Sequence, residues 1–224
     1  DAVLKKMKSA GCCAVSFGIE SANPQILKTI RKGITLGQVE DAVRMCKKAA
    51  ITPFASFILG LPGETPQTIK ETIEFGNRLK KLGLSYGFHL LAPFPGTEVR
   101  ESCERYGINI LTNDWSQYHA NRAIVETPSV DHKMLDDIVV KWEAEYDDYL
   151  SEIQSRMGKK EATETEIWEF ENLERIVLIY DLMMKGVIEA NGRQHHQGSS
   201  RTGKELIGFL SKKIGRSTGY DPKR

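Results

Sequence analysis

The stretch PFASFILGLPGETP, residues 53–66, places a strand, a tight turn and a helix start in immediate succession. Residues 53–59 form an apolar run that is too short for an ordinary helix, so they predict a buried strand. The Gly-Leu-Pro-Gly that follows predicts a turn. Thr65 and then Pro66 are a capping residue with proline at the first helical position, so a helix is predicted from there to Leu82. The positions expected to face inward on this helix are Ile69, Ile73, Phe75 and Leu79.

Similar units precede and follow this stretch. Residues 12–19 and 84–91 are short apolar runs, and they predict two more buried strands. Two short helices are predicted between the first and the second strand. Asn23 followed by proline is a capping start for the first of them, and Thr35 with Gln38 is a capping box for the second.

Buried strands that alternate with helices of this length predict an α/β fold with a parallel sheet built from right-handed βαβ units. Functional groups of such sheets collect at the carboxyl ends of the strands. The sequence therefore directs attention to three segments, residues 18–21, 60–64 and 92–97.

The second half of the chain has a different character. Residues 131–157 and 164–190 have apolar side chains at intervals of three or four, which predicts two long amphipathic helices. Residues 129–190 hold seven Lys/Arg against sixteen Asp/Glu, whereas residues 191–224 hold eight against two. This asymmetry suggests at least two units. We divide the chain into the sheet at 1–130, a helical region at 131–190, and a basic flexible tail with one short helix at 191–224, which could instead contact the acidic segment.

Composition argues against several classes of protein. The chain is 40% hydrophobic and 27% charged, which is ordinary for a globular protein. No apolar run reaches the roughly 18 residues of a membrane span, and no secretory signal is recognised, so we expect a cytoplasmic protein. A basic tail with few aromatic residues does not favour nucleic-acid binding. The cysteines lack CxxC spacing and are interpreted as reduced residues that serve as small hydrophobic side chains; they are Cys12, Cys13, Cys46 and Cys103.

Four motifs lie at or near the predicted strand ends: FGIES at 17–21, LKTIRKG at 27–33, FILGLPGET at 57–65 and APFPGT at 92–97. They resemble motifs of the radical S-adenosylmethionine (SAM) superfamily. DWSQY at 114–118 and VETP at 125–128 also resemble the segment after the barrel in the cobalamin-linked class, which includes the anaerobic Mg-protoporphyrin IX monomethyl ester cyclase. The resemblance covers about residues 1–130, and it rests on the order and spacing of these motifs.

The resemblance implies a partial (β/α)6 TIM-like barrel, of which the three predicted strands would be the fourth, fifth and sixth. It implies SAM and a [4Fe-4S] cluster as cofactors, with cobalamin as a further cofactor of the class. In the family a CxxxCxxC loop after the first strand holds the cluster, and reductive cleavage of SAM gives a 5′-deoxyadenosyl radical. None of the cysteines has that spacing, so the cluster ligands are expected outside this chain and no metal ligand is assigned within it. We therefore expect the C-terminal portion of a longer enzyme, inactive on its own.

The resemblance also implies which side chains contact SAM. Glu20 and Ser56 would meet the ribose, and Lys32 the carboxylate group, with Arg31 as the alternative to Lys32. The residues that would contact the adenine are Ile58, Gly60, Leu61 and Pro62, with glycine letting the base approach the backbone.

Two more residues, His89 and Pro93, are assigned to the substrate, and no catalytic residue is assigned. Each assignment has an interpretation without a ligand. Glu20 could stabilise the N-terminus of the next helix, Lys32 could be a solvated cation, and His89 could be a core histidine. The glycine turn could simply connect a strand to a helix, with Glu64 as a charge of that turn.

The leading hypothesis is the C-terminal portion of a radical SAM enzyme, an oxidoreductase or transferase that acts on a small molecule by methylation, ring formation or rearrangement. Its partners would be the N-terminal part of its own barrel and an external electron donor. The strand at 13–19 would form an exposed sheet edge through which the chain could self-associate. Two alternatives remain: a non-catalytic α/β interaction module, and a small enzyme that binds phosphate at a Gly-rich turn lacking the P-loop Lys-Ser/Thr.

Overall fold

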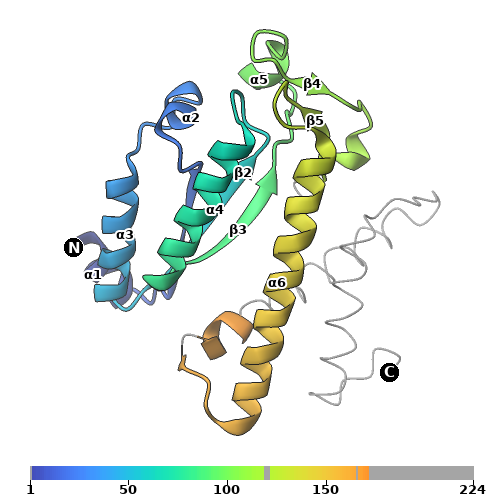
Figure 1. Cartoon of the computed structure of the whole chain (residues 1–224). Helices are drawn as coiled ribbons and strands as arrows, with labels where there is room; N and C mark the ends of the chain where they lie inside the picture. The colour runs from blue at the N-terminus through green and yellow to red at the C-terminus, as the bar shows by residue number, and fades with distance from the viewer. Residues whose placement is uncertain (1, 119–121, 165, 172–224) are drawn as a thin grey trace, which may run out of the picture. The chain divides into compact units, whose positions relative to one another are not determined.

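The computed structural model describes residues 2–118, 122–164 and 166–171. Its centre is a parallel sheet of β1 (Ala14–Glu20), β2 (Thr52–Leu59) and β3 (Ser85–Leu90), in the order β1-β2-β3 (Figure 1). The predicted α/β class and the parallel strands are confirmed, with strand bounds within two residues of those predicted. Among the described residues β1 is an edge strand, because it pairs with β2 alone.

The helices between these strands begin at the predicted caps. Asn23 caps α2 (Pro24–Thr29) by accepting hydrogen bonds from the amides of Gln25 and Ile26. The capping box of Thr35 opens α3 (Leu36–Lys48), and a second box, formed by Thr65 and Thr68, opens α4 (Pro66–Lys81). Each box satisfies backbone N–H groups that the first helical turn leaves without a partner, so local sequence alone determines where these helices start.

The core lies between one face of the sheet and the two longer helices, α3 and α4 (Figure 1). Along β2 the buried residues alternate with half-buried ones, so Phe57 and Leu59 face the helices whereas Ser56 and Ile58 face the other way. The helices contribute Val43, Phe75 and other apolar side chains to this core. Of the positions predicted to face inward on α4, Ile73 is only partly buried, and Thr72 takes its place in the core.

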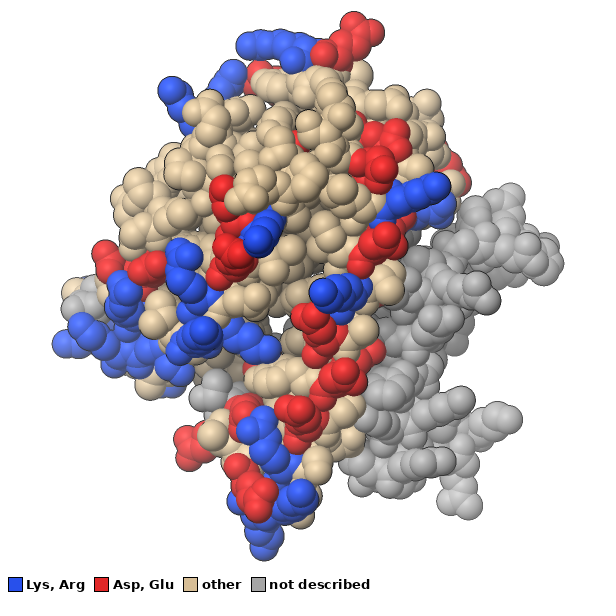
Figure 2. Space-filling model, viewed as in Figure 1, with Lys and Arg blue, Asp and Glu red and all other residues tan. Residues whose placement is uncertain are grey.

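Basic side chains gather where α1 (Ala2–Ser9), α3 and α4 end, at the edge of the sheet opposite the carboxyl ends of the strands. Figure 2 shows them as a blue group over α1 and the lower end of α3. Lys8 donates from Nζ to the carbonyl oxygen of Ala50 at 2.7 Å, which joins the end of α1 to the end of α3. Cations in the last turn of a helix interact favourably with its dipole, so these residues stabilise the helices that carry them.

Short elements follow β3: α5 (Glu98–Glu101), β4 (Asn109–Ile110), the 3-10 helix η1 (Trp115–Gln117) and β5 (Val125–Glu126). β4 and β5 pair antiparallel. This part of the chain has a small core that is separate from the core of the parallel sheet. Its buried residues are Ile108, Tyr118, Ile124 and Val125. The sequence analysis did not predict this short antiparallel pair, because a strand of two residues has too little periodicity to be recognised.

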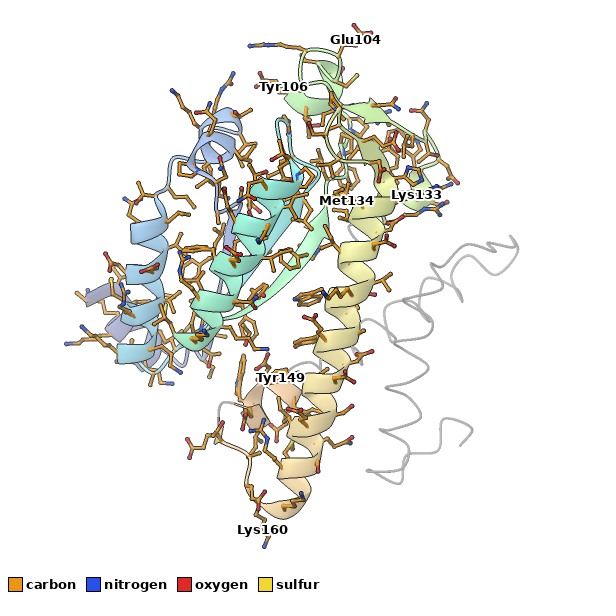
Figure 3. All side chains as sticks on the ribbon, viewed as in Figure 1. Glu104, Tyr106, Lys133, Met134, Tyr149 and Lys160 are labelled. Atoms are coloured by element: carbon orange, nitrogen blue, oxygen red, sulfur yellow. The ribbon has the colours of Figure 1, made fainter. Side chains whose placement is uncertain are left out.

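The helix predicted at 131–157 is confirmed as α6 (His132–Lys159). The chain divides into two compact units, residues 1–144 and 145–224, and the boundary falls within this helix. In the first unit Leu135 and Val139 join the main core. In the second unit Tyr149, which is labelled in Figure 3, donates a hydrogen bond to the carboxylate of Glu169 at 3.1 Å.

The second predicted long helix, 164–190, is described in part: residue 164 and residues 166–171 are helical. Its remainder and the predicted basic tail at 191–224 lie outside the described residues. None of the described helices combines the length and the apolar composition needed to cross a bilayer.

Candidate functional site

The carboxyl ends of β1, β2 and β3 lie side by side at the same end of the sheet, as a parallel arrangement requires. The segments predicted from sequence, 18–21, 60–64 and 92–97, follow these three ends. Because strands pair in register, Gly18 lies beside Ser56, and Ile58 lies beside His89. These four residues therefore share the face of the sheet that points away from α3 and α4.

A bulge at the end of β1 determines where Glu20 points. The pairing register between β1 and β2 shifts between Gly18 and Glu20, and Glu20 has a φ of 69°. A left-handed backbone is uncommon for a residue other than glycine and marks a position that its surroundings hold in place. Bulges re-aim side chains at the ends of strands, and this one turns the carboxylate of Glu20 back over the open face of β1.

Glu20 and Lys32 form an ion pair over Gly18. The Nζ of Lys32 donates to the Oε1 of Glu20 at 2.7 Å, and the side chains are 30% and 17% exposed for Lys32 and Glu20, respectively. A Cβ atom at Gly18 would lie 2.4 Å from the Glu20 Oε1 and 3.1 Å from the Lys32 Nζ. The missing side chain at Gly18 thus leaves the space in which this pair lies, beside Ser56 on the neighbouring strand.

Replacement of Gly18 by Ala is expected to displace this ion pair without unfolding the protein. The atoms that the new methyl group would meet are the ends of two flexible side chains, so we expect the free energy of unfolding to change by less than about 1 kcal/mol. Urea denaturation measures that change. A loss of more than about 2 kcal/mol would contradict the interpretation that Gly18 is required for space above the strand and not for the backbone.

Arg31, the alternative to Lys32, points elsewhere. Its guanidinium group donates to both carboxylate oxygens of Glu98 at 3.0 and 3.2 Å, which links the segment after β1 to α5 after β3. The hydroxyl of Tyr106 also donates to Glu98 at 2.6 Å, and this hydrogen bond, with the two nearby arginines, holds the pKa of the Glu98 carboxyl below its usual range. Of the two cations, Lys32 is therefore the one that reaches the end of β1.

The turn after β2 is more tightly packed than the sequence suggested. Gly60 has a φ of +88°, and a Cβ there would lie 3.3 Å from both Leu135 and Val125. The position thus requires glycine for its backbone conformation and for packing against the core, which agrees with the alternative of a tight strand-to-helix turn and does not depend on the approach of a ligand. The side chains of Leu61 and Pro62 are also buried, so any ligand would meet this turn through its backbone.

The burial of Glu64 is the largest difference between the structure and what the sequence predicted. This residue was interpreted as a charge of the turn, but it is only 1% exposed. Its Oε2 accepts hydrogen bonds from the amides of Gly60 and Leu61 at 2.7 and 3.1 Å. Burial raises the pKa of this carboxyl to about 7, although the two backbone hydrogen bonds act in the opposite direction.

The remaining predicted residues differ in their burial. His89 is exposed on the open face of the sheet, so the interpretation as a core histidine is wrong. Pro93 is buried, and its carbonyl oxygen accepts a hydrogen bond from Arg100, so its side chain does not line an open surface. Ser56 and Ile58 are half-buried on the face that also carries the Glu20–Lys32 pair.

A buried threonine, which the sequence analysis missed, joins the two candidate loops. Thr72 on α4 is completely buried, and its hydroxyl accepts a hydrogen bond from the backbone amide of Ala22 at 3.1 Å. It also lies 3.4 Å from the hydroxyl of Ser21, which is buried as well. The loop after β1 is thereby held against the helix that follows β2. A threonine inside an amphipathic helix gives no signal in the sequence that its hydroxyl will have a distant partner.

We expect Thr72→Val to lower the free energy of unfolding by about 1–3 kcal/mol, because the buried amide of Ala22 would lose its acceptor while the shape of the side chain is kept. Urea denaturation measures this loss. Thr29→Val is a matched control, since the Thr29 hydroxyl donates within its own helix to Gln25, and we expect a change below about 0.5 kcal/mol. Equal effects for the two variants would refute a special role for Thr72.

The described cysteines do not form a cluster site. Cys12 and Cys13 lie just before the amino end of β1, Cys46 is in α3, and Cys103 follows α5 beyond the opposite edge of the sheet. All four are free thiols; Cys46 is buried, as suits a small hydrophobic residue, whereas Cys13 is exposed, so that interpretation is wrong for Cys13. Within the described part of the chain, no three His, Cys, Asp or Glu side chains come together in a way that could hold a metal ion. These residues therefore do not fit an iron–sulfur cluster.

Comparison with protein families identifies the segment that builds this site. Residues 1–76 match the radical SAM superfamily, and this match contains β1, β2 and the turn at 60–63. Over this segment the chain is similar to the radical SAM superfamily. The motifs that suggested the resemblance at the ends of β1 and β2 lie inside the matched segment.

Individual relatives of this radical SAM segment are much longer proteins. An uncharacterised methyltransferase of Pyrococcus horikoshii is 44% identical over 117 residues, which are 52% of this chain and 25% of that protein. The anaerobic magnesium-protoporphyrin IX monomethyl ester cyclase of Cereibacter sphaeroides is 36% identical over 70 residues, 31% of this chain and 11% of that enzyme. Among solved structures, the radical SAM methyltransferase TsrM from Kitasatospora setae, with cobalamin and a [4Fe-4S] cluster bound, is 29% identical and covers 50% of this chain and 22% of its own, with a TM-score of 0.41.

Proposed function

We propose that this chain supplies the SAM-binding half of the barrel of a radical SAM enzyme of the cobalamin-linked class. The observation that carries the proposal is the convergence of Glu20, Lys32 and Ser56 at the ends of β1 and β2, within a segment of the superfamily. An ammonium group suits the carboxylate of SAM, and a carboxylate and a hydroxyl suit its ribose hydroxyls. The 2.7 Å contact between Lys32 and Glu20 supports a shared binding point, because both side chains reach it.

The chain's own residues would bind and orient SAM. Lys32 would exchange its contact with Glu20 for the SAM carboxylate, which leaves Glu20 to accept hydrogen bonds from the ribose. The adenine would lie along Ile58 and the backbone of the Gly60 turn. SAM held at a reduced iron–sulfur cluster is a source of a carbon radical, and since the described cysteines do not fit a cluster, its ligands would come from residues outside the described chain.

The rest of the barrel would pair with β1. An edge strand presents unpaired N–H and C=O groups, and another strand satisfies them best. We propose that the N-terminal part of the same barrel supplies that strand, and that the edge also permits self-association when the partner strand is missing. An external electron donor and a small-molecule substrate complete the proposal, with His89 on the open face as a substrate contact.

Methyl transfer is the reaction that we favour over ring formation. The relative from Pyrococcus horikoshii, named as a methyltransferase, is 44% identical over 117 residues, whereas the two cyclases are less similar, at 36% identity over 70 residues and 25% identity over 138 residues. Both fall within the oxidoreductase or transferase chemistry expected from sequence.

SAM binding to the polypeptide encoded by the complete open reading frame tests the proposal. After anaerobic reconstitution of the cluster, we expect calorimetry to show one SAM site, and SAM with a labelled methyl group to lose its label to a product or cofactor. A protein that binds no SAM under these conditions would contradict the proposal and would favour the alternative of a non-catalytic α/β interaction module.

A further inference from the structure

Glu64 closes the turn after β2 from two sides. Its Oε2 accepts hydrogen bonds from the amides of Gly60 and Leu61, and its own backbone amide donates to the carbonyl oxygen of Leu61 at 3.1 Å. The other carboxyl oxygen, Oε1, is buried and has no hydrogen-bond partner among the described residues. A buried carboxyl group that is only half satisfied is costly, particularly when it is charged.

The turn needs such a constraint because glycine alone does not hold a conformation. Gly60 and Gly63 have φ values of +88° and +81°, and glycine reaches many other conformations with equal ease. The two hydrogen bonds to Glu64 select one of them. They also occupy the amides of Gly60 and Leu61, so the backbone that would face the adenine is fixed before any ligand arrives.

Protonation of Glu64 has different effects on two states of the turn. In the closed state its hydrogen bonds to the amides of Gly60 and Leu61 are formed, and in the open state they are broken. In the closed turn burial favours the neutral carboxyl group, and among the described residues the other determinants of its pKa are the two backbone amides, with no charged side chain facing it. In an open turn the group would be in water, where it ionises more readily. The closed turn therefore binds this proton more tightly than the open one, and by linkage the proton stabilises the closed turn.

We propose that Glu64 is a positioning residue of the SAM site, whose neutral carboxyl group holds the turn at 60–63 closed and whose ionisation loosens that turn. The proposal rests on the proposed function in one respect, namely that SAM is the ligand that meets this turn. The stabilisation of the closed turn by Glu64 does not depend on a bound ligand.

Hydrogen exchange of the 224-residue chain tests this hold directly. After correction for intrinsic exchange, the opening constant reported by the amides of Gly60 and Leu61 is expected to rise at least tenfold between pH 5 and pH 8. In Glu64→Gln, which carries no titratable group at this position, it is expected to stay constant within about threefold. Glu74→Gln on the exposed side of α4 is the matched control and should behave like the unmodified chain.

The amide of Gly83, which donates to the carbonyl oxygen of Lys80, provides an internal reference that should not follow this pH dependence. A pH-independent opening constant for Gly60 in the unmodified chain would overturn the proposal, even if Glu64→Gln failed to fold. An equal rise in the opening constants of the Gly60 and Gly83 amides would also overturn the proposal, because the opening would then involve the whole fold.

A second measurement separates this proposal from the proposed function. With the reconstituted polypeptide of the complete open reading frame, saturating SAM is expected to lower the opening constant of the Gly60 amide at least tenfold. If the pH dependence is present but SAM does not bind, the proposed function fails and the hold of Glu64 on the turn stands. If SAM binds and leaves the Gly60 amide unchanged, Glu64 does not position the SAM site.

Discussion

SAM affinity is expected to fall about ten- to hundredfold when Glu20 is replaced by Ala in the polypeptide of the complete open reading frame. A charge-assisted hydrogen bond from a ribose hydroxyl to a half-buried carboxylate contributes about 1.5–3 kcal/mol, and about 1.4 kcal/mol corresponds to a factor of ten. Glu20 already has a left-handed backbone, so alanine adds little strain of its own. Lys32→Ala is expected to cost the same or less, because its ammonium is more exposed and hence more screened.

Calorimetry with SAM measures these affinities, and thermal unfolding of each variant shows whether the fold is kept. Glu74→Ala is a matched control, because Glu74 is exposed on α4 and contacts Lys70 at 3.8 Å. If Glu20→Ala left SAM affinity unchanged but lowered the free energy of unfolding by more than about 2 kcal/mol, Glu20 would be a structural residue of the bulge and not a ligand of SAM.

The second large effect concerns stability as a function of pH. Glu64 has a pKa of about 7 in the folded chain against 4.5 for an unperturbed glutamate. Between pH 4.5 and pH 7 the Glu64 carboxyl is ionised in the unfolded chain but still protonated in the folded chain. The contribution of this proton to the free energy of unfolding is therefore complete below pH 4.5. It is lost as the pH rises to 7, by about 3 kcal/mol in total at 1.36 kcal/mol per pH unit.

Comparison with Glu64→Gln isolates this contribution from all other titrating groups. The free energy of unfolding of the unmodified chain, minus that of the variant, is expected to decrease by about 3 kcal/mol between pH 4.5 and pH 8 and to level off above pH 7. Urea denaturation across this pH range measures the difference. A constant difference would show that the pKa of Glu64 is the same in the folded and the unfolded chain, and a difference that increases with pH would show that folding lowers it.

Local sequence was sufficient to predict the three strands of the parallel sheet and the helices that connect them. Asn23-Pro24, the capping box at Thr35 and Thr65-Pro66 each satisfy backbone groups within a few residues of themselves, so their effect does not depend on the rest of the fold. The apolar runs predicted β1, β2 and β3 for a similar reason, since a short continuous run between glycines suits a buried parallel strand. The motifs at the ends of β1 and β2 predicted the superfamily that the comparison then identified.

The position of the candidate site could be predicted from the sequence, but the contacts between its side chains could not. The rule that groups collect at the carboxyl ends of parallel strands brought Glu20 and the glycine turn to one edge. It gave no indication that Arg31 would pair with Glu98, 67 positions away, while Lys32 turned to Glu20. The choice between two adjacent cations depends on backbone direction at the end of a short helix, and the sequence pattern contains no information on that direction.

By itself, then, the sequence determined the strand and helix order, the parallel sheet and the edge at which the chemistry lies, because these follow from hydrophobic periodicity and caps that act over a few residues. Only the tertiary structure decided that Glu64 is buried and that Thr72 holds the loop after β1. The physical reason is that burial and pKa depend on residues distant in sequence, such as Val125 and Leu135, which close over the Gly60 turn once the chain has folded. A glutamate after a glycine turn has the same letters whether it faces water or a core, and its surroundings alone determine whether it carries a charge.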